Sequence, residues 1–389
     1  MRIVHVYNQL DPRNGGPPHV IVGLAAGQQA LGHEVAFVSE DDPDSPDLDS
    51  FLSDHLDPVP VRYAIQPRLF RPGRTRADFE SALTGADVVH MHGIWPVAPM
   101  LASRVCREMG IPWIVAPHGS LHQGALGEKR LKKLVGMWTL GYREYISDAA
   151  ALHVLNEHEA EGARHPSYVG VSLPEHIQVI PNGVFPDTFQ SQPSARSFRQ
   201  ENPDLGDDPY ILFLSRLHPG KGCHLLGEAF VQVQREHRDV RLVLVGQDQG
   251  GLELLMKSIR EAGLTDRVHV IGPLYDDRKH AAYREAAVYC LPSLHEGFSM
   301  AITEALGWGR PVVATTACHF PELTEHSCGL EVDVDSRSIA TGLSYVLENP
   351  TEAQEMGARG RALVFQRYTW SQIAAQTVAL YERVIEDSQ

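Results

Sequence analysis

The chain has 389 residues, a length that predicts two or three domains because domains average roughly 150 residues. Hydrophobic residues make up 43% and charged residues 21%, which is ordinary globular usage and excludes disordered, collagen-like and coiled-coil proteins. The formal net charge is −15, from 34 basic and 49 acidic residues, and it argues against a nucleic acid as a partner.

The five cysteines are widely spaced and include no CxxC pair. This pattern predicts neither a disulfide framework nor a thiolate zinc site, and it fits a reducing compartment. The first ten residues hold too short an apolar run for a secretory signal, and nowhere do about 18 apolar residues follow one another. We therefore expect a cytoplasmic protein that is soluble or peripheral at the inner face of the membrane.

The first half of the chain alternates between strand and helix patterns. Residues 2–7 (RIVHVY) predict a buried strand, a Gly-Pro turn follows at 15–18, and residues 19–32 have helical spacing. Further buried strands are predicted at five places: 33–39, 86–92, 112–118, 150–156 and 177–182. A strand, a Gly-rich turn, a helix and a strand open a doubly wound parallel sheet.

The second half repeats the pattern after a break. Residues 183–209 are rich in Pro, Ser, Asp and Gln and lack periodicity, which predicts a linker or a domain boundary. Strands are then predicted at 210–216, 240–246, 267–272, 286–293 and 310–315, and residues 370–387 predict a terminal helix.

These patterns predict an α/β protein made of two Rossmann-like, doubly wound parallel-sheet domains that face a cleft. We place one Rossmann-like domain at 1–185, a second at 186–369 and, at 370–389, a helix that crosses back to the first domain. Ligands of such sheets bind outside the carboxyl ends of the strands, so functional residues are expected in strand-to-helix loops.

The loop after the strand 210–216 contains Arg216, Lys221 and flanking glycines. Two cations on a loop that a ligand can approach closely suit a diphosphate whose charge is neutralised without a metal. Taken alone, the two side chains are equally well interpreted as solvated loop charges.

Residues 293–306 (SLHEGFSMAITEAL) are the most informative stretch. We expect Glu296 to lie in a loop after a strand, followed by a helix that begins near Ser299 and ends at Gly307 or Gly309. The alternative is that Glu296 is an exposed loop acid.

The start of this predicted helix has the properties of an anion site. Gly297 permits a tight turn, and the backbone amides of Phe298, Ser299 and Met300 would lie at the helix N-terminus, where a phosphate or a polarised hydroxyl binds. Glu304 follows on the same helix among nearly apolar residues, which makes a solvated position less favourable for it.

Together these residues resemble a known family. Glu296 and Glu304, with Gly-Phe-Ser after the first, look like the acid–seven–acid motif of the family-4 retaining glycosyltransferases of the GT-B fold, which belong to glycosyltransferase group 1. Arg216 and Lys221 resemble that family's diphosphate-binding pair.

Two N-terminal motifs extend the resemblance along the whole chain. Gly15 and Gly16 match the family's N-terminal glycine loop, and residues 181–184 (PNGV) match the turn that closes its first domain. The resemblance implies that Arg216 and Lys221 hold the donor diphosphate and stabilise the departing nucleotide, while the glycine loop closes over it.

The resemblance also implies an acceptor-binding domain at 1–185 and a nucleotide-sugar-binding domain at 186–369, and it assigns roles to the acids. Glu304 would accept hydrogen bonds from the ribose, and Glu296, with Gly297 and the amides of residues 298–300, would bind the donor sugar. The nucleobase would be lined by three residues of one loop: Gly272, Pro273 and Leu274.

His118 ends a predicted strand, and by the same resemblance it contacts the donor sugar near its reacting carbon. A histidine satisfied by packing is the alternative. His90 and His92 share one side of a strand and His118 and His122 are four apart, but no HExxH pattern accompanies them, so we expect no metal. No cofactor is expected either.

The expected activity is metal-independent, retaining transfer of a hexosyl unit from a UDP- or GDP-linked sugar to a hydroxyl acceptor, a glycan or lipid-linked glycan of polysaccharide or glycolipid biosynthesis. Retention implies a front-face attack; Glu296 as a covalent nucleophile is the alternative. Residues 119–143 hold four basic side chains among apolar ones and could gather a lipid-linked acceptor at a membrane, or be a solvated helix face.

Two other classes compete with a transferase. A NAD-dependent oxidoreductase could share the two Rossmann halves, but the first loop reads NGGPPHV without GxGxxG spacing, and Glu40 alone is placed for a ribose. A nucleotide-sugar epimerase or a binding protein of the same fold would need no acceptor.

Overall fold

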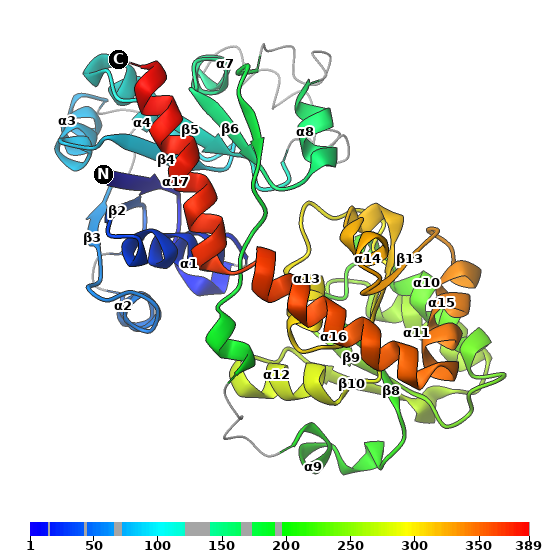
Figure 1. Ribbon diagram of the computed structural model, residues 1–389. Helices are drawn as coiled ribbons and strands as arrows, with labels where there is room; N and C mark the ends of the chain where they lie inside the picture. Colours follow the sequence, from blue (N-terminus) through cyan, green and yellow to red (C-terminus); the bar gives the residue numbers. More distant parts are fainter. Residues whose placement is uncertain are drawn as a thin grey trace. The chain divides into compact units, whose positions relative to one another are not determined.

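The computed structural model describes residues 1–14, 16–42, 45–65, 72–120, 141–164, 173–190 and 197–388. The chain divides into two compact units: 1–183 with 369–389, and 184–368. Each unit is an α/β layer structure built on its own parallel sheet (Figure 1).

In the described part of the first unit, seven parallel strands form a sheet of order β3-β2-β1-β4-β5-β6-β7. The strands are β1 (Arg2–Val6), β2 (Glu34–Ser39), β3 (Val61–Ala64), β4 (Val88–His92), β5 (Trp113–Ala116), β6 (Ala151–Val154) and β7 (Ile177–Val179). The helices are α1 (Gly16–Ala30), α2 (Pro46–Ser53), α3 (Pro72–Leu83), α4 (Val97–Met109), α7 (Tyr142–Ser147), α8 (Glu157–Arg164) and α17 (Trp370–Asp387), with a 3₁₀ turn η1 (Pro12–Asn14).

The second unit has a six-stranded parallel sheet of order β10-β9-β8-β11-β12-β13 in its described residues. Its strands are β8 (Tyr210–Leu214), β9 (Arg241–Val245), β10 (Val268–Gly272), β11 (Val288–Leu291), β12 (Val312–Thr315) and β13 (Gly329–Val332). Its helices are α9 (Phe198–Glu201), α10 (Cys223–Val233), α11 (Leu252–Glu261), α12 (Asp276–Glu285), α13 (Met300–Gly307), α14 (Glu322–Glu325), α15 (Ser336–Glu348) and α16 (Pro350–Arg367). Its 3₁₀ turns are η2 (Pro186–Phe189), η3 (Pro203–Leu205), η4 (Pro219–Lys221), η5 (Thr265–Arg267) and η6 (Thr316–Cys318).

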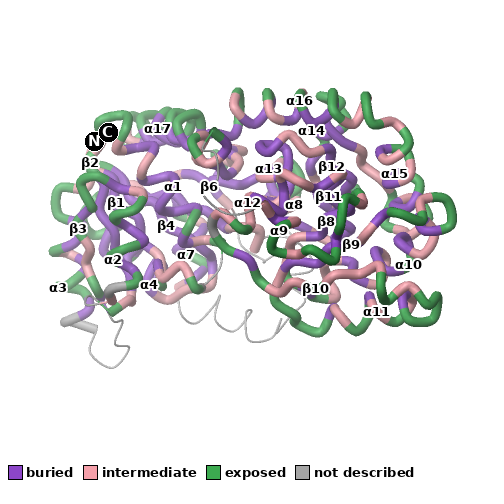
Figure 2. Tube along the Cα trace, turned by 90° about the horizontal axis from the view of Figure 1, so that it is seen from below, coloured by how far each residue is buried: buried purple, intermediate pink, exposed green. Residues whose placement is uncertain are grey.

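The central strands explain why the sequence shows unbroken apolar runs rather than alternation. Helices cover both faces of a parallel sheet, so side chains on both faces of a strand are buried. Strands β1, β4, β8 and β11 are buried along almost their whole length (Figure 2).

The C-terminal helix α17 is part of the first unit and lies against α1 (Figure 1). Glycines of α1 allow this close contact: a Cβ at Gly27 would lie 2.5 Å from the carbonyl oxygen of Trp370, and one at Gly23 would overlap its indole ring. The predicted helix at 370–387 is confirmed.

The second unit begins at Val184, inside the stretch predicted as a linker or a domain boundary. The stretch is not an unpacked linker, because Phe189, Phe198 and Leu205 are buried in the core of the second unit. The turn predicted at 15–18 is wrong for the described residues 16–18, which are helical. Gly16 is the first residue of α1, because prolines fit a first helical turn, whose amides need no partner within the helix.

In the described part of the chain, no helix is both long and apolar enough to cross a bilayer. The five cysteines are all free and buried.

Candidate functional site

In the second unit, residues predicted to bind the donor come together at the carboxyl edge of β8 and β11. The loop after β8 carries Arg216 and Lys221, and the loop after β11 carries Glu296. The amide of Leu294 donates to the carbonyl of Gly220 at 2.9 Å, which fastens one loop to the other.

Gly222 makes this approach of the two loops possible. Its φ is +67°, and a Cβ there would lie 1.8 Å from the carbonyl oxygen of Pro292. The position therefore requires a residue without a side chain, on both conformational and steric grounds. Gly222 is the N-cap of α10, so Lys221 lies at the end of η4, directly before this helix and beside the loop after β11.

Lys221 and Glu296 form an ion pair. The Nζ of Lys221 donates to Oε1 of Glu296 at 2.6 Å, and Oγ of Ser293 donates to the same oxygen at 2.5 Å. The two charged side chains are 18% and 9% exposed, so the pair is partly shielded from water and its geometry is fixed. The other carboxylate oxygen, Oε2, is not used in these bonds.

The helix predicted after Glu296 begins where the sequence indicates. Ser299 is the N-cap of α13, and its Oγ accepts a hydrogen bond from the amide of Ile302 at 3.3 Å. Phe298, Ser299 and Met300 therefore do lie at a helix N-terminus, where unpaired amides and the helix dipole favour an anion. Gly297 connects this terminus to Glu296.

Glu304, on the second turn of α13, accepts a hydrogen bond from Nζ of Lys279 on α12 at 2.8 Å. Its side chain is 20% exposed, so it is neither fully solvated nor in the core. The half-buried carboxylate therefore keeps a charged partner within its own unit.

The remaining donor-site predictions lie on neighbouring loops. Arg216 is exposed and donates to Oε1 of Gln249, after β9, at 3.4 Å. Gly272 ends β10 with φ +81°, and Pro273 and the buried Leu274 follow it. The predicted donor-binding residues in loops of the second unit therefore follow β8, β10 and β11, at one edge of one sheet. The loop after β9 adds Gln249, which the sequence did not predict.

In the first unit, His118 follows β5 and has φ +51°, a left-handed conformation that is uncommon for a residue with a side chain. The next amide, Gly119, donates to Oε1 of the buried Glu159 at 2.8 Å, and Leu155 donates to its other oxygen at 3.0 Å. Nε2 of His118 lies 2.9 Å from Nδ1 of His92. A hydrogen bond to His92, the last residue of β4, therefore fixes the His118 ring.

Burial keeps these histidines neutral. It lowers the pKa of His118 to about 3 and the pKa of His5 and His153 to about 4, and it lowers the pKa of His90 and His92 as well.

The ring nitrogens of His5, His90 and His92 lie within 4.8 Å of one another, close enough for a metal, but each ring is hydrogen-bonded to a neighbour. That no metal binds stays a prediction.

Several predictions fall outside the described residues. Gly15, His122 and most of the basic segment 119–143, namely residues 121–140, are not described. Gly16 is described and exposed, and a Cβ there would meet nothing within 4 Å, so packing of the first unit does not demand a glycine.

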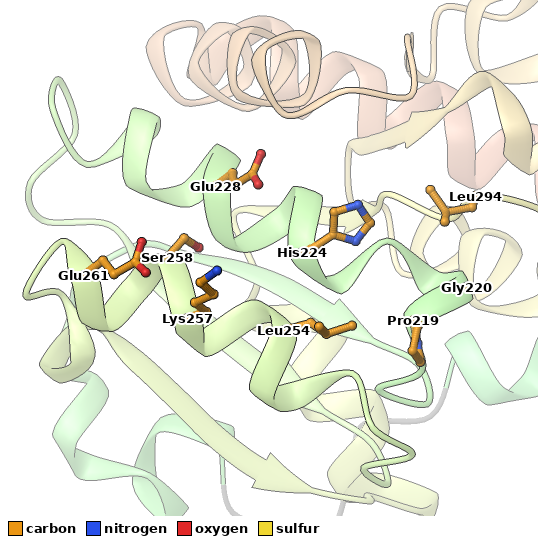
Figure 3. A pocket seen from close by; sticks show the side chains of 9 residues that line it. All are labelled: Pro219, Gly220, His224, Glu228, Leu254, Lys257, Ser258, Glu261 and Leu294. Atoms are coloured by element: carbon orange, nitrogen blue, oxygen red, sulfur yellow. The ribbon is translucent and has the colours of Figure 1, made fainter.

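A pocket of about 590 Å³ lies between α10 and α11 (Figure 3). Side chains such as His224, Glu228 and Lys257 line it, together with Gly220 and Leu294 from the two loops described above. None of the predicted donor-binding residues lines this pocket.

Comparison with known proteins decides the family. The family model described as "Glycosyl transferases group 1" matches residues 194–363. The model described as "Glycosyl transferase 4-like domain" matches residues 15–183. This chain is a group 1 glycosyltransferase. The oxidoreductase interpretation is thereby set aside.

Curated relatives of this glycosyltransferase include mycobacterial mannosyltransferases. The phosphatidyl-myo-inositol mannosyltransferase of Mycobacterium leprae is 29% identical over 95% of this chain and 93% of that protein. The MMP alpha-(1->4)-mannosyltransferase of Mycolicibacterium hassiacum is 35% identical, over 54% of this chain and only 49% of that protein.

Solved structures show that the glycosyltransferase has the GT-B fold. Anabaena Alr3699/HepE, in complex with UDP, has a TM-score of 0.78 at 20% identity, over 98% of this chain and 100% of that one. Sucrose-phosphate synthase from Thermosynechococcus elongatus has a TM-score of 0.73 at 22% identity, over 99% of both chains.

Three hydrogen-bond partners of the predicted site residues were not predicted from the sequence. The bond from Ser293 to Glu296 could have been expected, because Ser293 precedes Glu296 by only three residues in the SLHEG stretch. Lys279 and Gln249 carry no local signal, because only the meeting of different strand-to-helix loops brings them beside Glu304 and Arg216.

Proposed function

We propose that this glycosyltransferase moves a hexosyl unit from a nucleoside diphosphate sugar to a hydroxyl of a glycan or lipid-linked glycan, with retention of configuration and without a metal. One observation carries the proposal. The Lys221–Glu296 pair lies next to the N-terminus of α13, so a cation, a carboxylate and unpaired amides occupy the same edge of the sheet.

These groups suit the two ends of a sugar diphosphate. In this proposal the ammonium of Lys221 binds the diphosphate. Arg216 also binds it, and gives up its 3.4 Å hydrogen bond to Gln249 to do so. Glu296 keeps a carboxylate oxygen for the hydroxyls of the sugar, and Glu304 accepts from the ribose. Gly16, at the start of α1, is the remaining member of the proposed donor site; a Cβ there would meet nothing within 4 Å.

Charge development explains how this set of groups accelerates transfer without a metal. When the bond between the anomeric carbon and the phosphate oxygen breaks, positive charge builds on the sugar and negative charge on the diphosphate. Preorganised cations and amides stabilise the departing diphosphate, and this electrostatic effect is usually the largest single contribution to catalysis.

Retention follows from attack on the face that the diphosphate leaves. The acceptor oxygen bonds to the anomeric carbon, and its proton passes to an oxygen of the departing phosphate. Glu296 is already fixed by Lys221 and Ser293, which favours hydrogen bonding to the sugar over covalent attack.

The relatives favour a donor and an acceptor class. Mycobacterial relatives are named as mannosyltransferases, among them a GDP-mannose-dependent enzyme acting on a phosphatidylinositol mannoside. GDP-mannose is therefore the first donor to test and UDP-glucose the second, with an inositol glycolipid as acceptor. The basic segment 119–143 would gather this acceptor at an anionic membrane surface, which makes the protein peripheral there.

Turnover tests the proposal. Protein is incubated with GDP-mannose or UDP-glucose and vesicles that contain phosphatidylinositol, with EDTA and then with Mg²⁺, and the anomeric configuration of the product is read by NMR. We expect an α-linked product from an α-linked donor at equal rates with and without metal. An inverted product or dependence on Mg²⁺ contradicts the proposal.

His118→Ala gives the matched variant for the role of the histidine. It should reduce transfer while the affinity for GDP stays within about twofold of the wild-type value, since the residues proposed to bind the diphosphate lie in the other unit. His224→Ala, in the pocket of Figure 3, is the control and should change neither quantity. Unreduced transfer by His118→Ala would show that His118 is structural.

A further inference from the structure

A continuous line of hydrogen bonds runs behind His118 through the buried interior of the first unit. We call it the histidine chain. From the site inward its members are His118, His92, His5, Gln28, Tyr381, His90, His153 and the carbonyl oxygen of Ile180.

The inner end of the histidine chain fixes its direction. A carbonyl oxygen only accepts, so Nε2 of His153 donates to Ile180 at 2.8 Å. Because burial lowers the pKa of His153 to about 4, the ring is neutral and its Nδ1 must accept. Nε2 of His90, at 3.3 Å, is therefore the donor to it.

The direction continues through the helix contact between α17 and α1. Neutral His90 accepts at Nδ1 from the hydroxyl of Tyr381 at 2.7 Å, so that hydroxyl must itself accept from the amide nitrogen of Gln28 at 2.9 Å. The amide oxygen of Gln28 then accepts from Nε2 of His5 at 2.8 Å.

The direction of the hydrogen bonds is also fixed from His5 outward to His118. Nδ1 of His5 accepts from Nε2 of His92 at 2.9 Å, and Nδ1 of His92 accepts from Nε2 of His118 at 2.9 Å. Each neutral imidazole has one donor and one acceptor nitrogen, so Nδ1 of His118 is left as an acceptor. Among the described residues it has no hydrogen-bond partner.

The opposite direction fails at the inner end. If the amide of Gln28 were turned round, Tyr381 would donate to it and His90 would donate to Tyr381. His153 would then have to donate at both nitrogens, which needs a buried imidazolium without a counter-charge. Only one arrangement satisfies every member while all rings stay neutral.

We infer that the histidine chain holds His118 as the Nε2–H tautomer and presents its Nδ1 as a hydrogen-bond acceptor for a hydroxyl of the sugar substrate. This inference rests on the proposed function for the substrate, and on geometry for the tautomer. Gln28 and Tyr381 are positioning residues, although they lie on helices remote from the β5 loop. The histidine chain ends on the carbonyl oxygen of Ile180, which cannot take up a proton. It therefore orients the ring of His118 and does not conduct a proton away from it.

The tautomer is measured on the wild-type protein labelled with ¹⁵N-histidine. Long-range ¹H–¹⁵N spectra distinguish the two neutral tautomers and the imidazolium, and the His118 signals are identified by their loss in His118→Gln. We expect a neutral Nε2–H ring whose proton exchanges slowly with water. A proton on Nδ1 of His118 overturns the inference, whether or not transfer is observed.

Gln28→Met tests the link to catalysis. It keeps the side-chain volume but removes the acceptor of His5 and the donor to Tyr381. We expect the exchange of the His118 Nε2 proton to accelerate about tenfold and kcat to fall about tenfold, while KM for the donor and the affinity for GDP change less than about twofold. Tyr381→Phe should act in the same direction.

Tyr210→Phe is the matched control, because Tyr210 is a buried tyrosine of the second unit that donates to the carbonyl of Ala282 at 2.7 Å. It should cost comparable stability and leave the His118 signals and kcat unchanged. Unchanged His118 signals and kcat in Gln28→Met overturn the positioning role. A wild-type protein with the expected tautomer but no transfer contradicts the proposed function and leaves the tautomer assignment standing.

Discussion

The ammonium nitrogen of Lys221 lies 2.6 Å from Oε1 of Glu296, although the two residues are 75 positions apart in the chain. The pair joins the loop after β8 to the loop after β11, beside the N-terminus of α13. A donor that binds there meets a cation and a carboxylate whose positions are set before it arrives, which reduces the ordering cost of binding.

Lys221→Ala should weaken binding of GDP or UDP. Loss of a charge-assisted hydrogen bond costs about 1.5–3 kcal/mol, or roughly 10- to 150-fold in Kd, measured by calorimetry without metal. Lys257→Ala, whose side chain lines the pocket between α10 and α11, is the control and should bind normally. Equal affinities in the two variants would remove Lys221 from the diphosphate site.

Gly222→Ala should destabilise the second unit by at least about 2 kcal/mol, because the new Cβ overlaps the carbonyl of Pro292 in addition to the strain of a positive φ. Gly250→Ala has a φ of +87° but open space around its Cβ, so it should show the strain alone. Urea unfolding measures both. A Gly222→Ala variant no less stable than Gly250→Ala contradicts the close approach of the two loops.

Glu304→Ala should weaken binding of the ribonucleoside diphosphate by about tenfold through loss of a charged acceptor. The 2′,3′-dideoxy analogue should bind wild-type protein and variant equally, because it has no ribose hydroxyl to donate. Glu228→Ala is a control on α10. If Glu304→Ala weakens both nucleotides alike, the carboxylate acts through Lys279 rather than on the ribose.

The buried histidines should make the first unit acid-sensitive. Burial lowers the pKa of His5 and His153 from 6.5 to about 4, so between these values the unfolded chain binds protons that the folded unit refuses. Stability therefore rises with pH in this window and falls on acidification from about 6.5 to 4, by roughly 1.4 kcal/mol per pH unit for each such histidine. Hydrogen exchange of β1 and β4 peptides, corrected for intrinsic rates, measures this; constant protection from pH 7 to 5 would be inconsistent with it.

The fold could be predicted wherever the signal is local. Fully buried central strands and the helix at 370–387 have unbroken or periodic apolar patterns. Strands β3 (VRYA) and β13 (GLEV) were missed because they are short edge strands that are only partly buried, so neither pattern develops.

The site divides in the same way. Glu296 and the helix cap at Ser299 are specified within one stretch of sequence. The hydrogen bonds of His118 to His92, and onward to Gln28 and Tyr381, depend on how β4, α1 and α17 pack, which no local pattern encodes.

Thermal unfolding of the purified protein with GDP, UDP, ADP and NAD in parallel, first without metal and then with EDTA, tests directly whether the second unit binds a nucleoside diphosphate without a metal. A nucleotide at about 100 times its Kd should add roughly 2.7 kcal/mol of apparent stability to the second unit. We expect a higher unfolding midpoint with GDP or UDP, and we expect this shift to remain when EDTA is present. A shift with NAD alone, or one that EDTA abolishes, would contradict a metal-independent nucleoside diphosphate sugar site.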